Sequence, residues 1–376
     1  MAHEASINSV VFDQGGEKAA TTSDDYTVRL WAVGDEPGKV VARKRYPGSE
    51  SSAFSPDGRL LMTEGAEFND RQLFTTSDGK PFGRPIPVGG VTTAVAFSAD
   101  GERLFVSSRD GGQIWNVLSQ DPIGKQIAAG WVDHAAFTSD GKLLTVSIEG
   151  APRFWDASTG EPVGQPLTFL GIPRAASLSP DEKFVVAASR NTTARIWNLS
   201  TKAPVGAVLR HDARIWSAVF SPDGRFVLTA SDDKTARLWD AHTGRPAGDP
   251  LRHDSEVKHA TFSHDGSLVL TASEDGTVQV WDTASSMAVG RARYAGKSVG
   301  SAIFSTDDQN VLAISATAAI VLPFAETDRL RSLTYGCTSI GEQHDLVVLE
   351  QKYGIERLEP ICGSNPPFSV QLDSLR

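Results

Sequence analysis

Cysteine is nearly absent from this sequence, and the only two residues of this type, Cys337 and Cys362, lie close to its end. The rest of the fold therefore cannot depend on disulfide bonds. A Cys337–Cys362 bridge is compatible with the sequence, although two buried free thiols in a reducing compartment are favoured. The start, "MAHEASINSVVF", has neither the basic nor the apolar region of a signal peptide, and no run approaches eighteen apolar residues. We expect a soluble, cytoplasmic chain that does not enter a membrane.

Positive charge is also scarce, because 36 Lys and Arg face 46 Asp and Glu, for a formal net charge of −10. This balance argues against nucleic acid as a partner, since phosphate binding needs a basic surface. Catalytic and metal-binding motifs are missing as well: there is no G-x-S-x-G, H-E-x-x-H, paired C-x-x-C or EF-hand loop. We therefore expect no enzyme activity, no cofactor and no metal site.

What the sequence does contain is a repeat. "FSPDGRFVLTASDDKTARLWD" from Phe220 is followed 42 residues later by "FSHDGSLVLTASEDGTVQVWD" from Phe262. Two anchors recur in phase at steps of 40 to 43 residues. The first anchor, before an Asp/Gly turn, falls at Phe12, Phe54, Phe97, Phe137, Leu178, Phe220, Phe262 and Phe304. The second falls at Trp31, Phe74, Trp115, Trp155, Trp197, Trp239 and Trp281, and then in "VLPF" around Pro323. A period of this length predicts a propeller or a solenoid.

Each copy consists of strand patterns. "RFVLTAS" and "TARLWD" are short runs rich in Val, Leu and Thr, and "SPDG" is a turn in which Pro presets φ and Gly accepts a positive φ. Segments such as "TGEPVGQPL" from Thr159 add a proline-limited strand, which belongs at the edge of a sheet. The prediction is an all-β chain with four strands in each copy, as in a propeller blade.

These motifs resemble the WD40 repeat family over at least residues 3–324. The resemblance implies a single closed β-propeller, and the "TGxPxGxPL" style is similar to bacterial WD40 arrays. It also implies a buried His, Thr, Asp and Trp hydrogen-bond tetrad that pins each blade. Three copies carry all four residue types: His3, Thr21, Asp25 and Trp31; His211, Thr229, Asp233 and Trp239; His253, Thr271, Asp275 and Trp281. The other copies lack the His, so we expect apolar packing to hold those blades.

The blade count has two interpretations. Residues 1–360 would form the propeller, with eight clear repeats over 3–334 and a weak ninth over 335–360; residues 361–376 would be a tail that can supply the outer strand of the last blade. We favour nine blades. The alternative is eight blades followed by an irregular C-terminal segment.

Two tryptophans depart from the anchor positions. Trp131 and Trp216 lie six and four residues before the first anchor of their copies, where the family resemblance places the rim around the central channel. The corresponding rim positions of copies 4 to 7 hold Trp131, Asp133, Arg174, Arg190, Arg214, Trp216, Glu256 and Lys258. Trp and Arg are frequent at binding hot spots, and clustered guanidinium groups suit a carboxylate or a phosphate. The other interpretation is that Trp216 packs under a loop and that the arginines pair with Asp133, Asp212 and Asp232.

The sequence therefore predicts a non-enzymatic interaction, scaffold or sensor module, monomeric in isolation. Its top face over blades 4 to 6 would bind a protein or peptide, with an acidic or phosphorylated element as a preferred ligand. The first strand follows the chain start closely, which suggests a C-terminal module of a larger bacterial signalling protein. The rivals are a self-assembling structural ring and an enzyme that uses the central channel, but the inner strands are mostly small and apolar.

Overall fold

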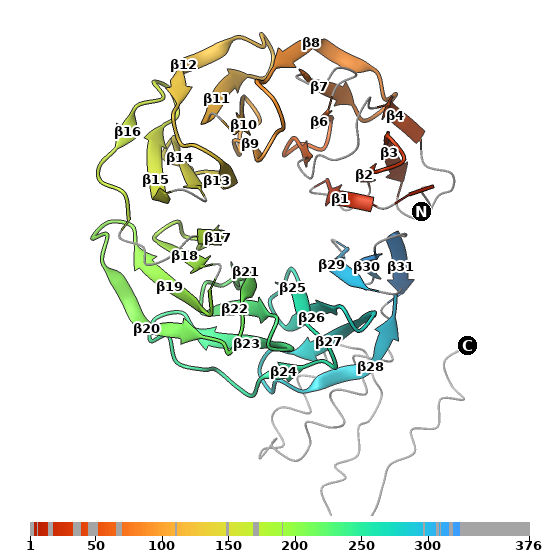
Figure 1. Cartoon of the computed structure of the whole chain (residues 1–376), viewed down its shortest axis with the longest axis vertical. Helices are drawn as coiled ribbons and strands as arrows, with labels where there is room; N and C mark the ends of the chain where they lie inside the picture. The colour runs from red at the N-terminus through yellow and green to blue at the C-terminus, as the bar shows by residue number, and fades with distance from the viewer. Residues whose placement is uncertain are drawn as a thin grey trace, which may run out of the picture.

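The computed structural model describes residues 4–5, 7–13, 18–32, 39–43, 52–64, 70–109, 111–147, 150–167, 173–189, 191–295, 298–305, 308, 310–315 and 319–323. These residues form strands and turns in eight antiparallel sheets. In each sheet the strands follow in chain order from the centre of the molecule outward (Figure 1). The all-β prediction and the four-stranded unit are thereby confirmed.

The first four sheets have four strands each. They are β1 (Ile7–Phe12), β2 (Lys18–Ser23), β3 (Thr27–Ala32) and β4 (Lys39–Arg43); β5 (Ala53–Phe54), β6 (Leu60–Glu64), β7 (Asp70–Thr75) and β8 (Pro81–Pro87); β9 (Val95–Phe97), β10 (Arg103–Ser108), β11 (Gly111–Asn116) and β12 (Pro122–Ile127); β13 (Val132–Phe137), β14 (Lys142–Ser147), β15 (Gly150–Asp156) and β16 (Pro162–Val163).

The next three sheets repeat this plan, and the eighth has three described strands. They are β17 (Pro173–Leu178), β18 (Phe184–Ser189), β19 (Thr193–Asn198) and β20 (Pro204–Arg210); β21 (Ile215–Phe220), β22 (Phe226–Ser231), β23 (Thr235–Asp240) and β24 (Leu251–Arg252); β25 (Val257–Phe262), β26 (Leu268–Ser273), β27 (Thr277–Asp282) and β28 (Ala288–Tyr294); β29 (Val299–Phe304), β30 (Asn310–Ser315) and β31 (Ala319–Pro323).

Burial explains the apolar character of the second strand in each sheet. In β22 every residue after Phe226 is buried, because the strand lies in the middle of its sheet and neighbouring sheets cover both faces. The outer strand β20 is mostly exposed and begins with Pro204, which pairs with Trp197 at the edge. Proline is tolerated there because the edge position needs no N–H for a further strand. The hydrophobic core is therefore a series of clusters between adjacent sheets.

The Ser-Pro-Asp-Gly turn is held by its own side chains. Ser221 Oγ donates to Asp223 Oδ1 at 2.6 Å and accepts the N–H of Phe226 at 2.9 Å. Gly224 has a φ of 71°, a left-handed conformation that is favourable for glycine. The turn thus directs the chain from the first strand of the sheet into the second.

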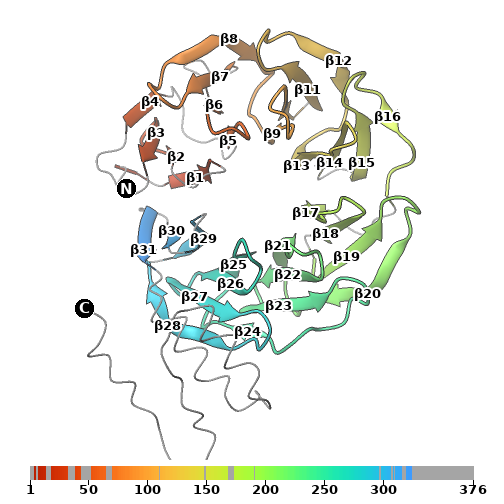
Figure 2. The ribbon, with the colours of Figure 1, turned by 180° about the vertical axis from the view of Figure 1, so that it is seen from behind.

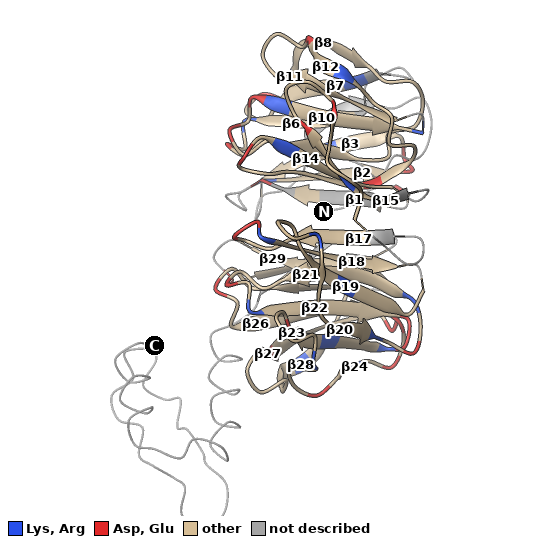
Figure 3. Cartoon of the chain, turned by 90° about the vertical axis from the view of Figure 1, so that its left-hand side faces the viewer, with Lys and Arg blue, Asp and Glu red and all other residues tan. Residues whose placement is uncertain are grey.

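The sheets follow one another around a common centre in chain order, as both face views show (Figures 1 and 2). The innermost strands of neighbouring sheets are in contact, and β1 of the first sheet also contacts β30 of the eighth. In a side view most acidic residues lie in the turns at the strand ends (Figure 3). Strand ends thus form two polar faces, and the strands between them form the apolar layers.

Several sequence predictions lie outside the described residues. They are the ninth repeat at 335–360, the tail at 361–376, the pairing of Cys337 with Cys362, and His3 of the first tetrad. The blade count of nine therefore remains a prediction. Within the described residues no helix is long and apolar enough to cross a membrane.

Candidate protein-binding rim

A β-bulge near the start of the innermost strand shapes one face of the molecule. In six sheets the register between the first and second strands shifts at this point, so one residue has no ladder partner. The residues at the shift are Asn8, Asp133, Arg174, Trp216, Lys258 and Gly300. Bulges change the direction of a side chain and are common beside functional sites. The rim positions that the sequence singled out four residues before the anchor are therefore bulge residues.

Trp216 lies at the centre of a cluster that we call the Trp216 cluster: Arg214, Trp216, Asp232, Glu256, Lys258 and Glu274. Its ring is half-buried between two cations, with Arg214 Cζ at 4.1 Å and Lys258 Nζ at 4.3 Å from the ring centroid. Its indole N–H donates to Asp232. Cations over an aromatic face are attracted by the ring quadrupole, so this stacking fixes the orientation of the indole.

Carboxylates neutralise both cations of the Trp216 cluster. Asp232 lies 3.0 Å from the Arg214 guanidinium and 2.9 Å from Lys258 Nζ. Lys258 also pairs with Glu256 and, at 3.1 Å, with Glu274. The cluster thus holds three carboxylates and two cations. Part of the alternative interpretation is correct, because Arg214 does pair with Asp232, although 43% of its side chain is exposed.

The ion pairs control ionisation in the Trp216 cluster. Burial opposes the charge of Asp232, but hydrogen bonds from Lys258 and Trp216 outweigh burial and lower the pKa of this carboxyl. Burial likewise opposes the charge of Lys258, yet Glu256, Asp232 and Glu274 together raise the pKa of its ammonium group. Asp232 and Lys258 are therefore both charged at neutral pH and lie beside a fixed indole.

Trp131 belongs to a different arrangement, the Trp131 pair. It lies just before β13 and is half-buried, and Arg109 Cζ lies 4.8 Å from its ring centroid. Arg109 is exposed and lies in the turn after β10 of the third sheet. The sequence analysis missed Arg109, because the shorter loop of that copy hides its equivalence to Asp232, the residue that follows β22. Arg109 can be found from the sequence at the first position after the second strand of its repeat.

The predicted rim residues are thus distributed over two groups and not gathered in one. The stacking partner of Trp131 comes from the third sheet, and the partners of Trp216 come from the sixth and seventh. Asp133 is half-buried at its bulge and has a bonding partner. Arg174 is a bulge residue of β17, but its side chain lies outside the described part of the chain, and Arg190 lies outside it entirely.

Below the rim, a chain of hydrogen bonds runs through the sixth sheet. His211 Nδ1 lies 2.8 Å from Asp233, and its Nε2 lies 2.7 Å from the hydroxyl of Thr229. Thr229 also accepts the indole N–H of Trp239 at 2.8 Å. With the proton on His211 Nδ1, the Thr229 hydroxyl donates to Nε2, so both ring nitrogens of His211 and the Trp239 N–H have a partner. Burial opposes the charge of Asp233, but these bonds hold the pKa of its carboxyl well below the usual range.

The seventh sheet contains the same chain. His253 lies 3.0 Å from Asp275 and 2.7 Å from Thr271, which accepts the indole N–H of Trp281 at 2.8 Å. In the first sheet the indole N–H of Trp31 donates to Thr21, and Asp25 accepts from the hydroxyl of Thr27. In the fourth sheet, the described residues contain the final link, from Trp155 to Thr145.

Comparisons with known proteins agree with this architecture. Four segments, residues 1–32, 171–198, 203–240 and 250–282, match the WD40 family, described as "WD domain, G-beta repeat". The repeats in these four segments, about a third of the chain, are therefore similar to WD40 repeats. Protein HIR1 of Mycosarcoma maydis is 31% identical over 116 residues, which are 29% of this chain and 11% of that protein. The chain thus spans about a tenth of the length of this curated relative.

Among solved structures, the computationally designed Ika8 protein is similar to this chain in fold. It has a TM-score of 0.68 and 19% sequence identity, and the match covers 86% of this chain and 97% of Ika8. At this identity the likeness concerns the fold alone. The designed protein is a β-propeller, which agrees with the sheets described above.

The inner strands include two histidines. They carry His134 and His259, and burial lowers the pKa of both imidazoles, so both are neutral at pH 7. His259 Nδ1 lies 3.0 Å from the carbonyl oxygen of Ala302 in the next sheet, which gives it a structural partner. No group of three His, Cys, Asp or Glu that could hold a metal ion occurs in the part of the chain that the structure describes. WD40 repeats in other proteins are generally non-enzymatic and bind other proteins.

Proposed function

We propose that the rim over the fourth to sixth sheets binds a protein or peptide partner without catalysing a reaction. The observation that carries this proposal is the placement of Trp131 and Trp216. Neither is an anchor between sheets, yet each is half-buried at the rim with a cation stacked on its ring. Large aromatic rings of this kind dominate binding hot spots when a partner completes their burial.

The partner's chemistry follows from the cations beside the two rings. Arg109 is exposed on the Trp131 ring, and Arg214 is partly exposed on the Trp216 ring. An acidic or phosphorylated element of the partner would accept hydrogen bonds from these guanidinium groups. At Arg214 it would compete with Asp232, so we place the stronger contribution at the Trp131 pair.

The wider setting is part of the same proposal. The sheets would be blades of one closed propeller, and the contact between β1 and β30 supports closure between the first and eighth sheets. A ninth blade from residues 335–360 remains the alternative. The module would be a cytoplasmic monomer in isolation and would act as the sensor of a larger bacterial signalling protein.

The test compares partner capture by the wild type with capture by a Trp131→Ala/Arg214→Glu/Trp216→Ala variant that circular dichroism shows to be folded. Loss of a defined partner, with recovery by an acidic or phosphorylated peptide of that partner as a competitor, supports the rim. The matched control is Leu118→Ala, because Leu118 is 78% exposed in the turn between β11 and β12, at the opposite strand ends from Arg109. If the triple variant captures the same partner as the wild type, the rim is not the binding site. Sedimentation velocity over a range of concentrations separates the self-assembling ring from the monomer.

A further inference from the structure

The fifth sheet differs from the sixth in the turn between its second and third strands. Both turns have the same length and the same backbone pattern. The N–H of Asn191 donates to Ser189 Oγ at 2.9 Å, and the N–H of Asp233 donates to Ser231 Oγ at 3.1 Å. A neutral amide side chain, that of Asn191, therefore stands in the fifth sheet where the sixth sheet has a carboxylate.

In the sixth sheet this carboxylate is an acceptor for two neighbouring side chains. Asp233 Oδ1 accepts the hydroxyl of Thr235 at 2.6 Å, and Asp233 Oδ2 accepts a guanidinium N–H of Arg237 at 3.2 Å. The Nε of Arg237 donates to the Thr235 hydroxyl, also at 3.2 Å. In the first sheet the carboxylate of Asp25 lies 3.8 Å from Arg29 in the same way. An arginine at this register position is thus neutralised by its own turn in both sheets.

The fifth sheet keeps the donors of this arrangement without its acceptor. Thr193 and Arg195 follow Asn191 at the same spacing and register as their counterparts in the sixth sheet. In the part of the chain that the structure describes, no hydrogen bond or ion pair involves the side chains of Asn191, Thr193 or Arg195, and Arg195 Nε is buried. A buried N–H without an acceptor costs desolvation free energy, which an anionic ligand would offset.

These three side chains can be reached from solvent at the rim end of the strands. Asn191 is exposed, and Thr193 and Arg195 are half-buried. Their turn lies beside the start of β17, because Ser189 at the end of β18 pairs with Pro173. A guanidinium, a hydroxyl and an amide NH₂ group can all donate hydrogen bonds to one carboxylate.

We propose that Asn191, Thr193 and Arg195 bind a carboxylate from a glutamate or aspartate side chain of a protein partner. The carboxylate of the ligand takes the place that Asp233 holds in the sixth sheet. It accepts hydrogen bonds from the guanidinium, the hydroxyl and the amide of the three residues. This site contains neither rim tryptophan, so it does not depend on the function proposed for the rim.

The first experiment follows the Nε–Hε signal of Arg195 by NMR while the full chain is titrated with N-acetylglutamate α-amide. Loss of the signal in Arg195→Lys assigns it. The control probe, N-acetylglutamine α-amide, has the same shape without the charge. We expect the glutamate probe to shift the signal saturably at millimolar concentration and the glutamine probe to leave it in place, because hydrogen bonds to an ionised group are the stronger ones.

Three results of this titration would overturn the proposal. One is an Arg195 signal that does not move at tens of millimolar of the glutamate probe, and another is an equal shift with both probes. The third is a shift with N-acetylphosphoserine α-amide but not with the glutamate probe, because the ligand would then be a phosphate group.

A variant that fills the site from within tests its location. Asn191→Asp supplies the carboxylate from the chain itself, as Asp233 does in the sixth sheet. It should move the Arg195 signal without any probe and weaken binding of the glutamate probe at least about tenfold, because an intramolecular carboxylate competes at a high effective concentration. Binding like that of the wild type in a folded Asn191→Asp chain contradicts the site.

The matched control makes the same change of charge at the other end of β19. Asn198 accepts the N–H groups of the turn that follows it, and Asp240 does so at the equivalent position of the sixth sheet. Asn198→Asp should therefore fold and bind the glutamate probe like the wild type. Equal weakening in Asn198→Asp and Asn191→Asp would assign the effect to net charge and contradict the site. Thr193→Val should weaken binding severalfold, and unchanged binding in this variant contradicts the site even if Asn191→Asp fails to fold.

Discussion

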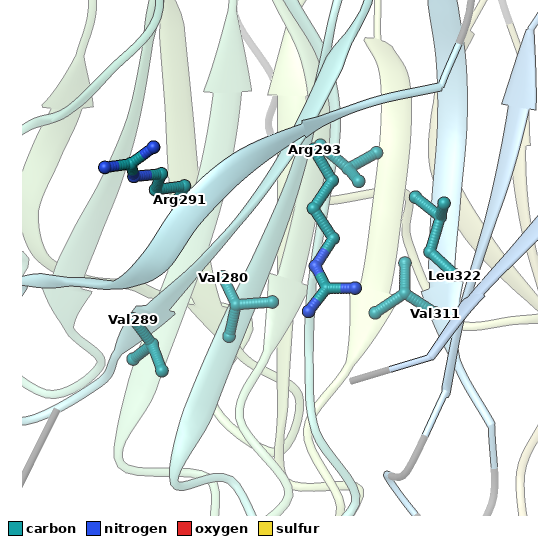
Figure 4. A pocket seen from close by; sticks show the side chains of 7 residues that line it. Val280, Val289, Arg291, Arg293, Val311 and Leu322 are labelled. Carbon is teal, nitrogen blue, oxygen red and sulfur yellow. The ribbon is translucent and has the colours of Figure 1, made fainter. Parts of the chain in front are cut away.

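The interface between the fifth and sixth sheets differs from the interface between the seventh and eighth in how it is filled. In the former, Trp239 is 4% exposed, packs against Leu209 and takes part in the hydrogen-bond chain through Thr229 and His211. In the latter, Leu322 pairs with Val311 as Trp239 pairs with Val227, and Arg293 pairs with Val278 as Leu209 pairs with Ala194 (Figure 4). The backbone plan is the same in both, so the side chains at these two register positions set how much apolar volume each interface holds.

The largest effect on stability should come from replacing the indole between the fifth and sixth sheets with the leucine found between the seventh and eighth. Trp239→Leu should lower the free energy of unfolding by about 3 kcal/mol, because it removes a buried ring and leaves a cavity. Urea denaturation measures the change. The control is Trp131→Leu at the half-buried rim, which should cost less than about 1 kcal/mol. A loss below about 1 kcal/mol for Trp239→Leu would show that the indole is not what closes this interface.

A second variant pair separates the hydrogen-bond chain from packing. Thr229→Val leaves the Trp239 N–H and the Nε2 atom of His211 without a partner and should cost about 2–3 kcal/mol. Thr145→Val affects only the N–H of Trp155, so we expect a loss of about 1–2 kcal/mol. Denaturation of the two variants under the same conditions gives the order of the losses. If Thr145→Val costs as much as Thr229→Val, the histidine link adds nothing to the stability of its sheet.

The reverse change should have a smaller effect on the free energy of unfolding and should stabilise the chain. The double variant Leu322→Trp/Arg293→Leu gives the interface between the seventh and eighth sheets the residues found between the fifth and sixth. It should raise the free energy of unfolding by about 1 kcal/mol, as cavity-filling changes commonly do. Thermal melting and urea denaturation are the measurements. The single change Arg293→Leu is the control for the loss of the half-buried guanidinium. A destabilised double variant would mean that the two interfaces differ in more than these two side chains.

The smallest effect should be a dependence on pH that arises from histidines between the sheets. Burial lowers the pKa of His253, although Asp275 opposes this, and burial also lowers the pKa of His259. The unfolded chain then binds more protons than the folded chain just below the ordinary histidine pKa, so stability should fall as pH drops through about 6.5. Urea denaturation at pH 7.5 and 5.5 measures this difference.

Two matched variants test whether His259 causes this pH dependence of stability. His259→Asn should reduce it, whereas Leu118→Ala should leave it unchanged, because Leu118 is 78% exposed and its replacement removes no titratable group. An identical pH dependence in His259→Asn and the wild type would remove His259 from the explanation.

Much of the fold and only part of the site could be predicted from the sequence. The period, the Ser-Pro-Asp-Gly turns and the proline-limited strands specify local structure, so the all-β repeat and its four strands were accessible. The rim was harder. Trp131 and Trp216 were recognised because they break the repeat, but Arg109 was missed, and the pairing of Arg214 with Asp232 was only one of two interpretations.

The sequence by itself determined what repeats: strand order, turn chemistry and the residues that anchor one sheet to the next, because these depend on local conformation and on burial at a fixed spacing. Only the tertiary structure decided what adjacent sheets do together. It placed Lys258 of the seventh sheet on Trp216 of the sixth and Arg109 of the third sheet on Trp131 of the fourth. It also brought Arg293 and Leu322 to the same interface. Such contacts join residues of different repeats. Their strength depends on the distance between the two repeats, which the sequence of either repeat alone does not specify.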